Sequence, residues 1–369
     1  MSRPAQSRYQ HRAGANCESA CLRNALAAQG LALEEEVVFG LDGNIGFALF
    51  EREGPEPDLV VGRQTIFPGQ ALRLLGCSVQ AQQRTPLSRL RQWLAQGEVV
   101  VARVDLAALP HHATLEGASA PFGGYFVNLC GQLPPLNSDG EGEFLVSDPA
   151  CAELLRVPVD QVQQARLSSA CPPINPNGWC YVLGGGAQAP ALERLGPAAL
   201  AQSAREMLRP ALKQQGCSGL LQLQRRVAQW PELKRGTLPP PPGSPGLPRW
   251  PALTWQLRAL GSAIELWGTG GGLFRPLWTR FIERVAQALP DPALNAAATH
   301  IARSAQAWQH MGQTCLSLTP SSSAEALRHT LNEVQRLLSL LIPEERLALE
   351  HLAQADVRAR RQHLAGGPP

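Results

Sequence analysis

Cys17 stands in the segment HRAGANCESACLRNAL, directly after the small residues Gly14 and Ala15 and the polar Asn16. A cysteine attacks as its thiolate, and the unpaired N–H groups and dipole at a helix start favour that charge. Gly14 permits a tight entry into a helix, and Asn16 is a good N-cap residue or a side-chain oxyanion donor. Because cysteine is also among the most buried residue types, Cys17 is either a nucleophile or a packing residue.

A thiolate nucleophile needs a proton-transfer partner and a group that orients this partner. Two strand-like runs, 125–130 and 143–147, flank the turn-rich segment QLPPLNSDGEG and predict an antiparallel hairpin. If the turn centres near Asn137 and Ser138, facing residues have numbers that sum to about 275. Tyr125 and Asp148 would then lie near the same end of neighbouring strands. Histidine in place of Tyr125 would complete a Cys–His–Asp set.

The elements that must position these residues divide the chain near 186–196. Before this point the pattern predicts helices over 18–29, 71–75 and 87–96, and strands over 99–106, 125–130, 143–147 and 179–183. After it the pattern predicts helices over 198–208, 217–228, 253–267, 273–289, 292–310, 324–341 and 344–355. The join, GGGAQAPALERLG, is typical of a linker. We therefore predict a first domain over 1–185, a linker over 186–194 and a helical domain over 195–369.

Composition excludes several classes of protein. The 369 residues are 44% hydrophobic and 17% charged, which indicates a globular chain of about two domains. The net charge of +3 is evenly spread and favours neither nucleic acid nor an anionic membrane as a partner. No apolar run approaches the roughly 20 residues of a spanning helix. The polar first residues contain no signal-peptide core.

The nine cysteines are an odd number without the spacing of a disulfide framework. Together with the absence of an export signal, this predicts reduced thiols in a cytoplasmic protein. Cys17 and Cys21 lie one helical turn apart, but no paired Cys or His cluster completes a zinc site, so no bound metal is expected. Cys21, one turn deeper on the apolar face, is expected to pack in the core.

Two regions of the chain resemble the butirosin biosynthesis protein H family. HRAGANCESACLRNALAAQG followed by VVFGLDGNIGFALF is similar to the N-terminal domain of that family. IELWGTGGGLFRPLWTRFIERVAQAL resembles the helical domain that follows in many members. The resemblance extends over roughly 8–185 and 195–315. It implies a papain-like cysteine-peptidase fold of class α+β for the first domain and an all-α second domain.

The resemblance also implies an activity, which is acyl transfer from a carrier-protein thioester to an amine in secondary-metabolite biosynthesis. Cys17 matches the family nucleophile, Asp148 in LVSDPA matches the acidic position, and His11 matches a histidine often found ahead of the cysteine. The implied partners are an acyl carrier protein, whose phosphopantetheine arm would carry the acyl donor, and a small amine acceptor. No tightly bound cofactor is expected. The backbone N–H of Cys17, with Asn16, would hold the oxyanion.

Tyr125 departs from the family pattern, which has histidine at this position of GGYFVNLCG. Tyrosine has a reference pKa near 10 and is a poor general base at neutral pH, whereas histidine has one near 6.5. Three interpretations follow. His11, His111 or His112 replaces the base; the helix-ionised Cys17 reacts with an activated thioester without a base; or the protein binds without turnover. A thiol hydrolase or peptidase would use the same thiolate and admit water.

Two glycine-rich segments allow a functional and a packing interpretation. In GLDGNIGFALF, the residues Gly43, Gly46 and Phe47 form either a tight turn before a strand or a wall of the acyl pocket.

The second segment, GTGGG at 268–272, fits neither a Walker loop nor a dinucleotide fingerprint. Its glycines Gly270, Gly271 and Gly272, with Arg275 on the next helix, could still bind an anion. That anion would be a phosphopantetheine arm, a substrate carboxylate or Glu265 of the same chain. Alternatively, the glycines let two helices turn and pack tightly.

Overall fold

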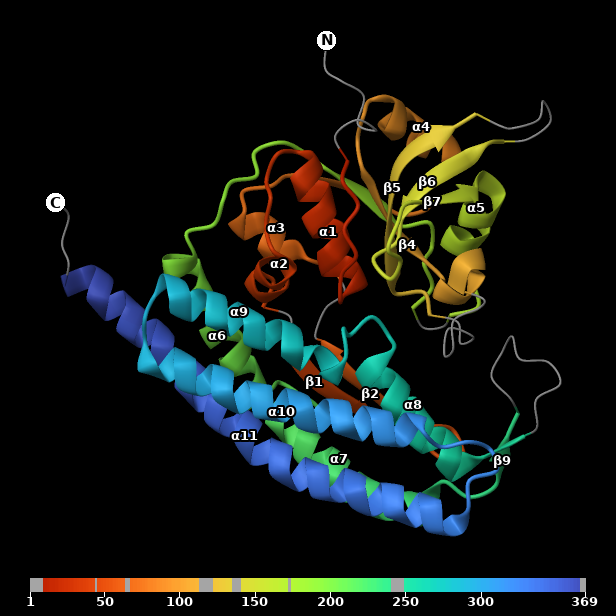
Figure 1. The fold of residues 1–369 in the computed structure, drawn as a ribbon, viewed down its shortest axis with the longest axis vertical. Coiled ribbons are helices and arrows are strands. Elements are labelled where there is room, and N and C mark those ends of the chain that lie inside the picture. Colours follow the sequence, from red (N-terminus) through yellow and green to blue (C-terminus); the bar gives the residue numbers. More distant parts are fainter. Residues whose placement is uncertain are drawn as a thin grey trace. The chain divides into compact units, whose positions relative to one another are not determined.

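The computed structural model describes residues 9–43, 45–63, 67–112, 122–134, 141–171, 174–239 and 249–365, the last ten without side chains (Figure 1). The described residues separate into two units. One consists of residues 9–38 and 67–189, and the other of residues 39–63, 190–239 and 249–365. The first unit mixes helices and strands and the second is mainly helical, which confirms the predicted fold classes.

The first unit is built on a six-stranded antiparallel sheet with the order β3-β8-β4-β5-β6-β7. Its strands are β3 (Val79–Gln82), β4 (Val100–Val104), β5 (Tyr125–Leu133), β6 (Glu143–Ser147), β7 (Leu155–Pro158) and β8 (Cys180–Leu183). Its helices are α1 (Cys17–Ala28), α3 (Gly69–Leu74), α4 (Leu87–Ala95) and α5 (Val159–Leu167), with short 3₁₀ turns η2 (Leu106–Ala108) and η3 (Pro110–His112).

Helix α1 begins at Cys17 because Asn16 caps it. The Asn16 side-chain oxygen accepts the backbone N–H of Ser19 at 2.9 Å, which confirms the predicted N-cap. The helix packs on β5 and β4 and is buried from Cys17 to Leu26 (Figure 1). Asn128 of β5 donates its side-chain N–H to the Cys21 carbonyl at 2.8 Å. The helix that begins at Cys17 therefore packs on the antiparallel sheet of the first unit.

The hairpin of β5 and β6 has the predicted register. Asn128 faces Ser147 and Leu129 faces Val146, so the paired numbers sum to 275. A bulge after Leu129 shifts the remaining pairs by one residue. Tyr125 therefore opens β5 at the same end of the hairpin where Asp148 follows β6. The centre of the predicted turn lies in residues 135–140, outside the described part of the chain.

The second unit contains long helices that pack along one another. These are α6 (Leu192–Leu208), α7 (Gly216–Leu233), α8 (Ala252–Glu265), α9 (Arg275–Ala288), α10 (Pro292–Leu316) and α11 (Ala324–Ala365), with the 3₁₀ turn η4 (Gly272–Phe274) before α9. Helices α10 and α11 run side by side (Figure 1). The sequence predicted two helices where α11 continues through Pro343. Leu341 and Ala348 are both fully buried, so the apolar stripe continues past the proline and holds the helix together.

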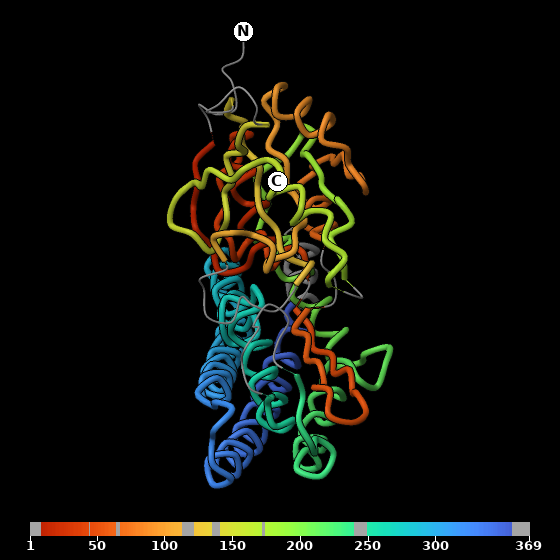
Figure 2. The backbone as a smooth tube through the Cα atoms, turned by 90° about the vertical axis from the view of Figure 1, so that its right-hand side faces the viewer, coloured from red at the N-terminus to blue at the C-terminus, as the bar shows by residue number. Residues whose placement is uncertain are grey.

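One segment differs from the predicted division of the chain. Residues 39–63 pack in the second unit, whereas the sequence placed them in the first domain; α2 (Glu35–Leu41) crosses the boundary. A Cβ on Gly40 would lie 1.9 Å from the ring of Phe281, so only glycine permits this close approach. The segment then forms the antiparallel hairpin β1 (Ile45–Phe50) and β2 (Leu59–Arg63) beside the helices (Figure 2).

A second short hairpin pairs β9 (Thr237–Leu238) with β10 (Trp250–Pro251), so the second unit is not purely helical. None of the helices in the described part of the chain has the length and apolar character required to cross a membrane.

Candidate active site

Asp148 is the centre of a hydrogen-bond cluster in the first unit. Its carboxylate is fully buried and accepts four hydrogen bonds. The donors are the Tyr125 hydroxyl at 2.6 Å, His111 Nε2 at 2.8 Å, His112 Nε2 at 2.7 Å and the Ala150 backbone N–H at 2.9 Å. Burial acts to raise the pKa of Asp148, but these hydrogen bonds and the nearby His112 charge outweigh it and hold the pKa well below its usual range. Asp148 is therefore an anion at neutral pH.

The two histidines reach Asp148 from the short 3₁₀ turn η3, ahead of the tyrosine strand. Both use Nε2 on the same carboxylate oxygen. Because an ionised carboxylate only accepts hydrogen bonds, both Nε2 atoms must carry a proton. In the neutral ring this leaves Nδ1 as the nitrogen that accepts a proton. This is the arrangement in which an acidic residue sets the tautomer of a catalytic histidine.

Tyr125 stands where the resemblance implies a histidine, and its chemistry differs from that of a base. Burial, followed by the charges of Asp148 and Cys17, raises the pKa of Tyr125 well above its ordinary value. The phenol is therefore neutral and donates to Asp148. His112 packs edge-on against it, with ring centroids 5.3 Å apart. Tyr125 thus orients the carboxylate, and the imidazole is supplied by the neighbouring turn.

Cys17 lies at the first position of α1 and is 6% exposed. Its charge raises the pKa of both Tyr125 and Cys21, so the thiol stands within electrostatic reach of the Asp148 cluster. Burial and then the Cys17 charge raise the pKa of Cys21 far above the normal value. The fully buried Cys21 is therefore an inert packing residue, as predicted.

His11 has a different environment from the other two histidines. Its Nδ1 lies 2.7 Å from Ser147 Oγ and its Nε2 lies 3.0 Å from the Cys151 carbonyl. Since Tyr9 already donates to Ser147 Oγ, the serine proton points to His11 Nδ1, and His11 Nε2 donates to the carbonyl. Both ring nitrogens therefore tie the first described residues to the end of β6. This geometry favours a positioning role for His11 over that of a base.

Glu35 fixes the loop that precedes Cys17. Its carboxylate accepts the backbone N–H groups of Ala15 at 3.0 Å and Asn16 at 2.7 Å. It also accepts the Ser19 hydroxyl at 3.1 Å and lies 3.5 Å from the Arg23 guanidinium. The loop from which Cys17 and Asn16 were expected to hold an oxyanion is thus rigidly anchored. Sequence reasoning missed Glu35, because nothing in LEEEVV singles out one of three consecutive glutamates.

A second thiol, that of Cys151, lies beside the cluster. The metal-binding atoms of His111, Asp148 and Cys151 lie within 4.8 Å of one another. Burial, and then the charge of Asp148, raises the pKa of Cys151 to about 11. Cys151 is therefore a poor nucleophile at neutral pH. Sequence analysis assigned no role in the site to Cys151, because a lone cysteine after the acidic position carries no motif.

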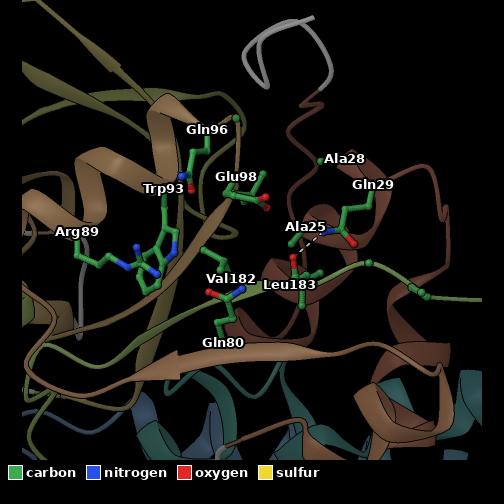
Figure 3. A pocket seen from close by; sticks show the side chains of 16 residues that line it. Ala25, Ala28, Gln29, Gln80, Arg89, Trp93, Gln96, Glu98, Val182 and Leu183 are labelled. Atoms are coloured by element: carbon green, nitrogen blue, oxygen red, sulfur yellow. Dashed lines mark hydrogen bonds between the residues drawn. The ribbon is translucent and has the colours of Figure 1, made fainter. Parts of the chain in front are cut away.

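A separate pocket of about 680 Å³ opens near the end of α1 (Figure 3). Gln29, Trp93 and Glu98 line it, together with the backbone of Gly184. Figure 3 shows Arg89 stacked on Trp93, with the guanidinium 4.7 Å from the ring centroid. Burial raises the pKa of Glu98. The pocket shares no lining residue with the Asp148 cluster, so it is not the site predicted from the sequence.

The three residues proposed as a wall of the acyl pocket serve the packing of the second unit. The Gly43 carbonyl accepts the Ser203 hydroxyl at 3.0 Å. The Gly46 carbonyl accepts Arg275 Nη1 at 3.1 Å. The Phe47 ring stacks on Trp308 with centroids 6.1 Å apart. These contacts favour the interpretation as a turn before a strand, namely β1.

The glycine turn at 268–272 also has an internal explanation. The Gly272 backbone N–H donates to Glu265 Oε1 at 2.9 Å, so this chain's own carboxylate occupies the turn. Gly270 and Gly271 both have positive φ, which glycine alone adopts readily. Arg275 is buried and pairs with Glu345 at 2.8 Å. These contacts favour the interpretation as a tight turn, with Glu265 as the anion, over a phosphate or substrate site.

Comparisons with known proteins found family models and solved structures that match parts of this chain. The family model described as "Butirosin biosynthesis protein H, N-terminal" matches residues 16–149. The model described as "Domain of unknown function (DUF4872)" matches residues 244–352. No curated protein sequence matches the chain. A solved structure titled as a C39-like peptidase from Bacillus anthracis is similar over 51% of this chain and 100% of its own, with 12% identity and a TM-score of 0.36.

The first match contains the whole cluster, from Cys17 through His111, His112 and Tyr125 to Asp148. The family predicted from the two sequence regions is confirmed by two separate models in the expected order. The chain therefore contains a region that matches the N-terminal domain of butirosin biosynthesis protein H, over residues 16–149, followed by a DUF4872 domain over residues 244–352.

Proposed function

We propose that this protein is a cysteine-dependent acyltransferase that forms an amide through an acyl-Cys17 intermediate. The family supports a papain-like cysteine enzyme. The observation that carries the proposal is the pair of histidine N–H groups on the buried Asp148 carboxylate. It supplies the base that the tyrosine at position 125 cannot supply.

His112 is the stronger candidate for the base. It is 3% exposed and packs on Tyr125, the residue whose pKa responds to the charge of Cys17. His111 is more exposed than His112, and it lies near Cys151 as well as Asp148. A buried imidazole held by an anion on one nitrogen presents its other nitrogen to the nucleophile.

The proposed reaction has two steps. In the first, His112 Nδ1 takes the Cys17 proton and the sulfur attacks the thioester carbonyl. The carbon–sulfur bond to the donor breaks, and the donor thiolate takes the proton from His112. In the second, an amine attacks acyl-Cys17 and gives its proton to His112, and Cys17 leaves as the thiolate. Asp148 stabilises the imidazolium formed in both steps.

The donor that we propose is a thioester on the phosphopantetheine arm of an acyl carrier protein, and the acceptor is a small amine. A water molecule in place of the amine would make the protein a hydrolase. A protein that binds without turnover would form no acyl adduct at all.

The test uses the full chain and short acyl thioesters of N-acetylcysteamine, which mimic the end of a phosphopantetheine arm. Intact-mass spectrometry should show one acyl adduct, and peptide mapping should place it on Cys17. We expect the adduct to persist in buffer and to disappear as an amide when a primary amine is added. Decay at the same rate without amine would indicate a hydrolase. Absence of any adduct, in a protein whose Cys17 still reacts with iodoacetamide, would contradict the proposal.

A further inference from the structure

The loop that carries Asp148 brings a soft ligand beside two harder ones. Cys151 contributes a thiol, His111 an imidazole and Asp148 a carboxylate, and their ligand atoms lie within 4.8 Å of one another. His111 Nε2 and Asp148 Oδ2 are already 2.8 Å apart. To bind an ion through Nε2, the neutral His111 ring would hold its proton on Nδ1 instead, and the Cys151 thiol would release its proton to solvent. A tetrahedral zinc ion holds such ligands at about 2.0–2.3 Å, which places them roughly 3.3–3.7 Å from one another. Closing the set around an ion therefore requires shifts of only about 1 Å.

The three ligands sit on a firmly held frame. The Cys151 backbone N–H donates to the Asp148 carbonyl at 3.0 Å, and the Cys151 carbonyl lies 3.0 Å from His11 Nε2. Asp148 is further held by Tyr125 and His112. Partners of this kind orient ligands and strengthen metal binding.

The cluster is also reachable. Cys151 and His111 are half-buried, whereas Asp148 and Cys17 are buried. An ion arriving from solvent would therefore meet the thiol and the imidazole first. A thiolate, an imidazole and a carboxylate together select a borderline-soft ion such as Zn²⁺ over Mg²⁺ or Ca²⁺, which prefer oxygen ligands.

We propose that His111, Asp148 and Cys151 form a binding site for Zn²⁺, with water in the fourth position, and that the bound ion inhibits Cys17. The inhibitory half of this proposal rests on the proposed function. An ion on Asp148 would take the carboxylate that orients His112 and place a positive charge next to the imidazole. His112 would then lose the hydrogen bond that orients its ring.

The test begins with Co²⁺ as a spectroscopic probe of the full-length protein. We expect one equivalent to bind with a thiolate-to-cobalt charge-transfer band and the visible bands of a tetrahedral site, both displaced by Zn²⁺. The band should disappear in Cys151→Ser. It should remain in Cys17→Ser, and in Cys217→Ser, which removes another half-buried thiol. Binding should weaken in Cys151→Ser by more than the roughly 10–100-fold that loss of an outer-shell partner causes.

Two further readouts complete the test. In the wild-type protein, Zn²⁺ should protect Cys151 from alkylation, which peptide mapping detects without any substitution. One equivalent of Zn²⁺ should slow alkylation of Cys17 at least about tenfold in the wild type and leave Cys151→Ser nearly unaffected.

Absence of cobalt binding, or a band that is lost in Cys17→Ser and kept in Cys151→Ser, would overturn the site. Slow alkylation of metal-free Cys17 at pH 6 would instead count against the proposed function, and the cobalt band would still decide the metal site.

Discussion

Each unit of this protein buries a carboxylate, but the partners of the two carboxylates differ in kind. In the first unit, Asp148 is bonded by two imidazoles and a phenol. In the second, Glu345 is bonded by the Arg275 guanidinium at 2.8 and 3.0 Å, by the Ser304 hydroxyl and by the Trp308 indole. In both, burial acts to raise the pKa, and the bonded partners outweigh it and lower the pKa.

The difference lies in whether the partner can give up a proton. Arginine keeps its charge at every pH that matters, so the Glu345 pair is fixed and serves the fold. Asp58 in the same unit also forms ion pairs with basic side chains, those of Arg226 and the buried Lys234. An imidazole, unlike a guanidinium group, can accept and release a proton during a reaction, and the Asp148 carboxylate is placed to stabilise its charged form. Protonatable partners, and not burial alone, distinguish the site to which we assign the proposed reaction.

The largest effect is expected from His112→Ala. If Asp148 acts through this imidazole, the rate of Cys17 acylation by a thioester should fall by about 10²–10⁴. His111→Ala, measured beside it, should lower the rate less. An equal or larger loss for His111→Ala would assign the base to His111, and no loss for either would contradict the distinction between the two carboxylates.

The Glu345 site should respond in stability instead. Glu345→Gln leaves the Arg275 guanidinium buried beside a neutral group, and removing one partner of a buried pair costs about 3–5 kcal/mol. Denaturant unfolding of the full chain measures this loss. Glu350→Gln is the matched control on the same helix, because its pair with Arg346 is exposed and should change stability little. Alkylation of Cys17 at its native rate in folded Glu345→Gln would show that the two sites are separate.

Acid should reveal the Asp148 anion. Because its pKa is lower in the folded chain than in the unfolded chain, the unfolded chain binds more protons as the pH falls below about 4. The stability that the ionised Asp148 contributes is therefore present above that pH and lost below it. The unfolding free energy of Asp148→Asn should fall less steeply than that of the wild type, by up to about 1.4 kcal/mol per pH unit. Parallel slopes would show that the folded-state pKa is not lowered.

The smallest effect is expected from His11→Ala. Its ring nitrogens bond Ser147 and the Cys151 carbonyl, so its loss should change the acylation rate less than about threefold, against the 10²–10⁴ expected for a base. If the acylation rate instead falls by about 10²–10⁴, His11 would be a candidate for the base.

The sequence predicted the parts of the site that depend on local pattern. Helix α1 and its cap follow from Asn16 and the apolar spacing after Cys17. The placement of Tyr125 beside Asp148 follows from two alternating strands around one turn. Both are short-range consequences of periodicity and turn chemistry.

The rest depends on contacts between distant residues. The sequence could name His111 and His112 as candidates. It could not show that both contact Asp148, because no periodic pattern fixes the path of the chain between β4 and β5. The segment 39–63 joins the second unit through contacts such as Phe47 on Trp308, which lie far apart in the chain. Propensity and spacing carry no information about such pairings.

The decisive measurement is alkylation of Cys17 by iodoacetamide at pH 6, with the site mapped by mass spectrometry, in the wild type and in His112→Ala. An ordinary cysteine has a pKa near 8.5 and is almost fully protonated at this pH. Fast alkylation in the wild type and slow alkylation in His112→Ala is the predicted result. Slow alkylation in both, or equal rates in the two proteins, would contradict a thiolate primed by the histidine on Asp148.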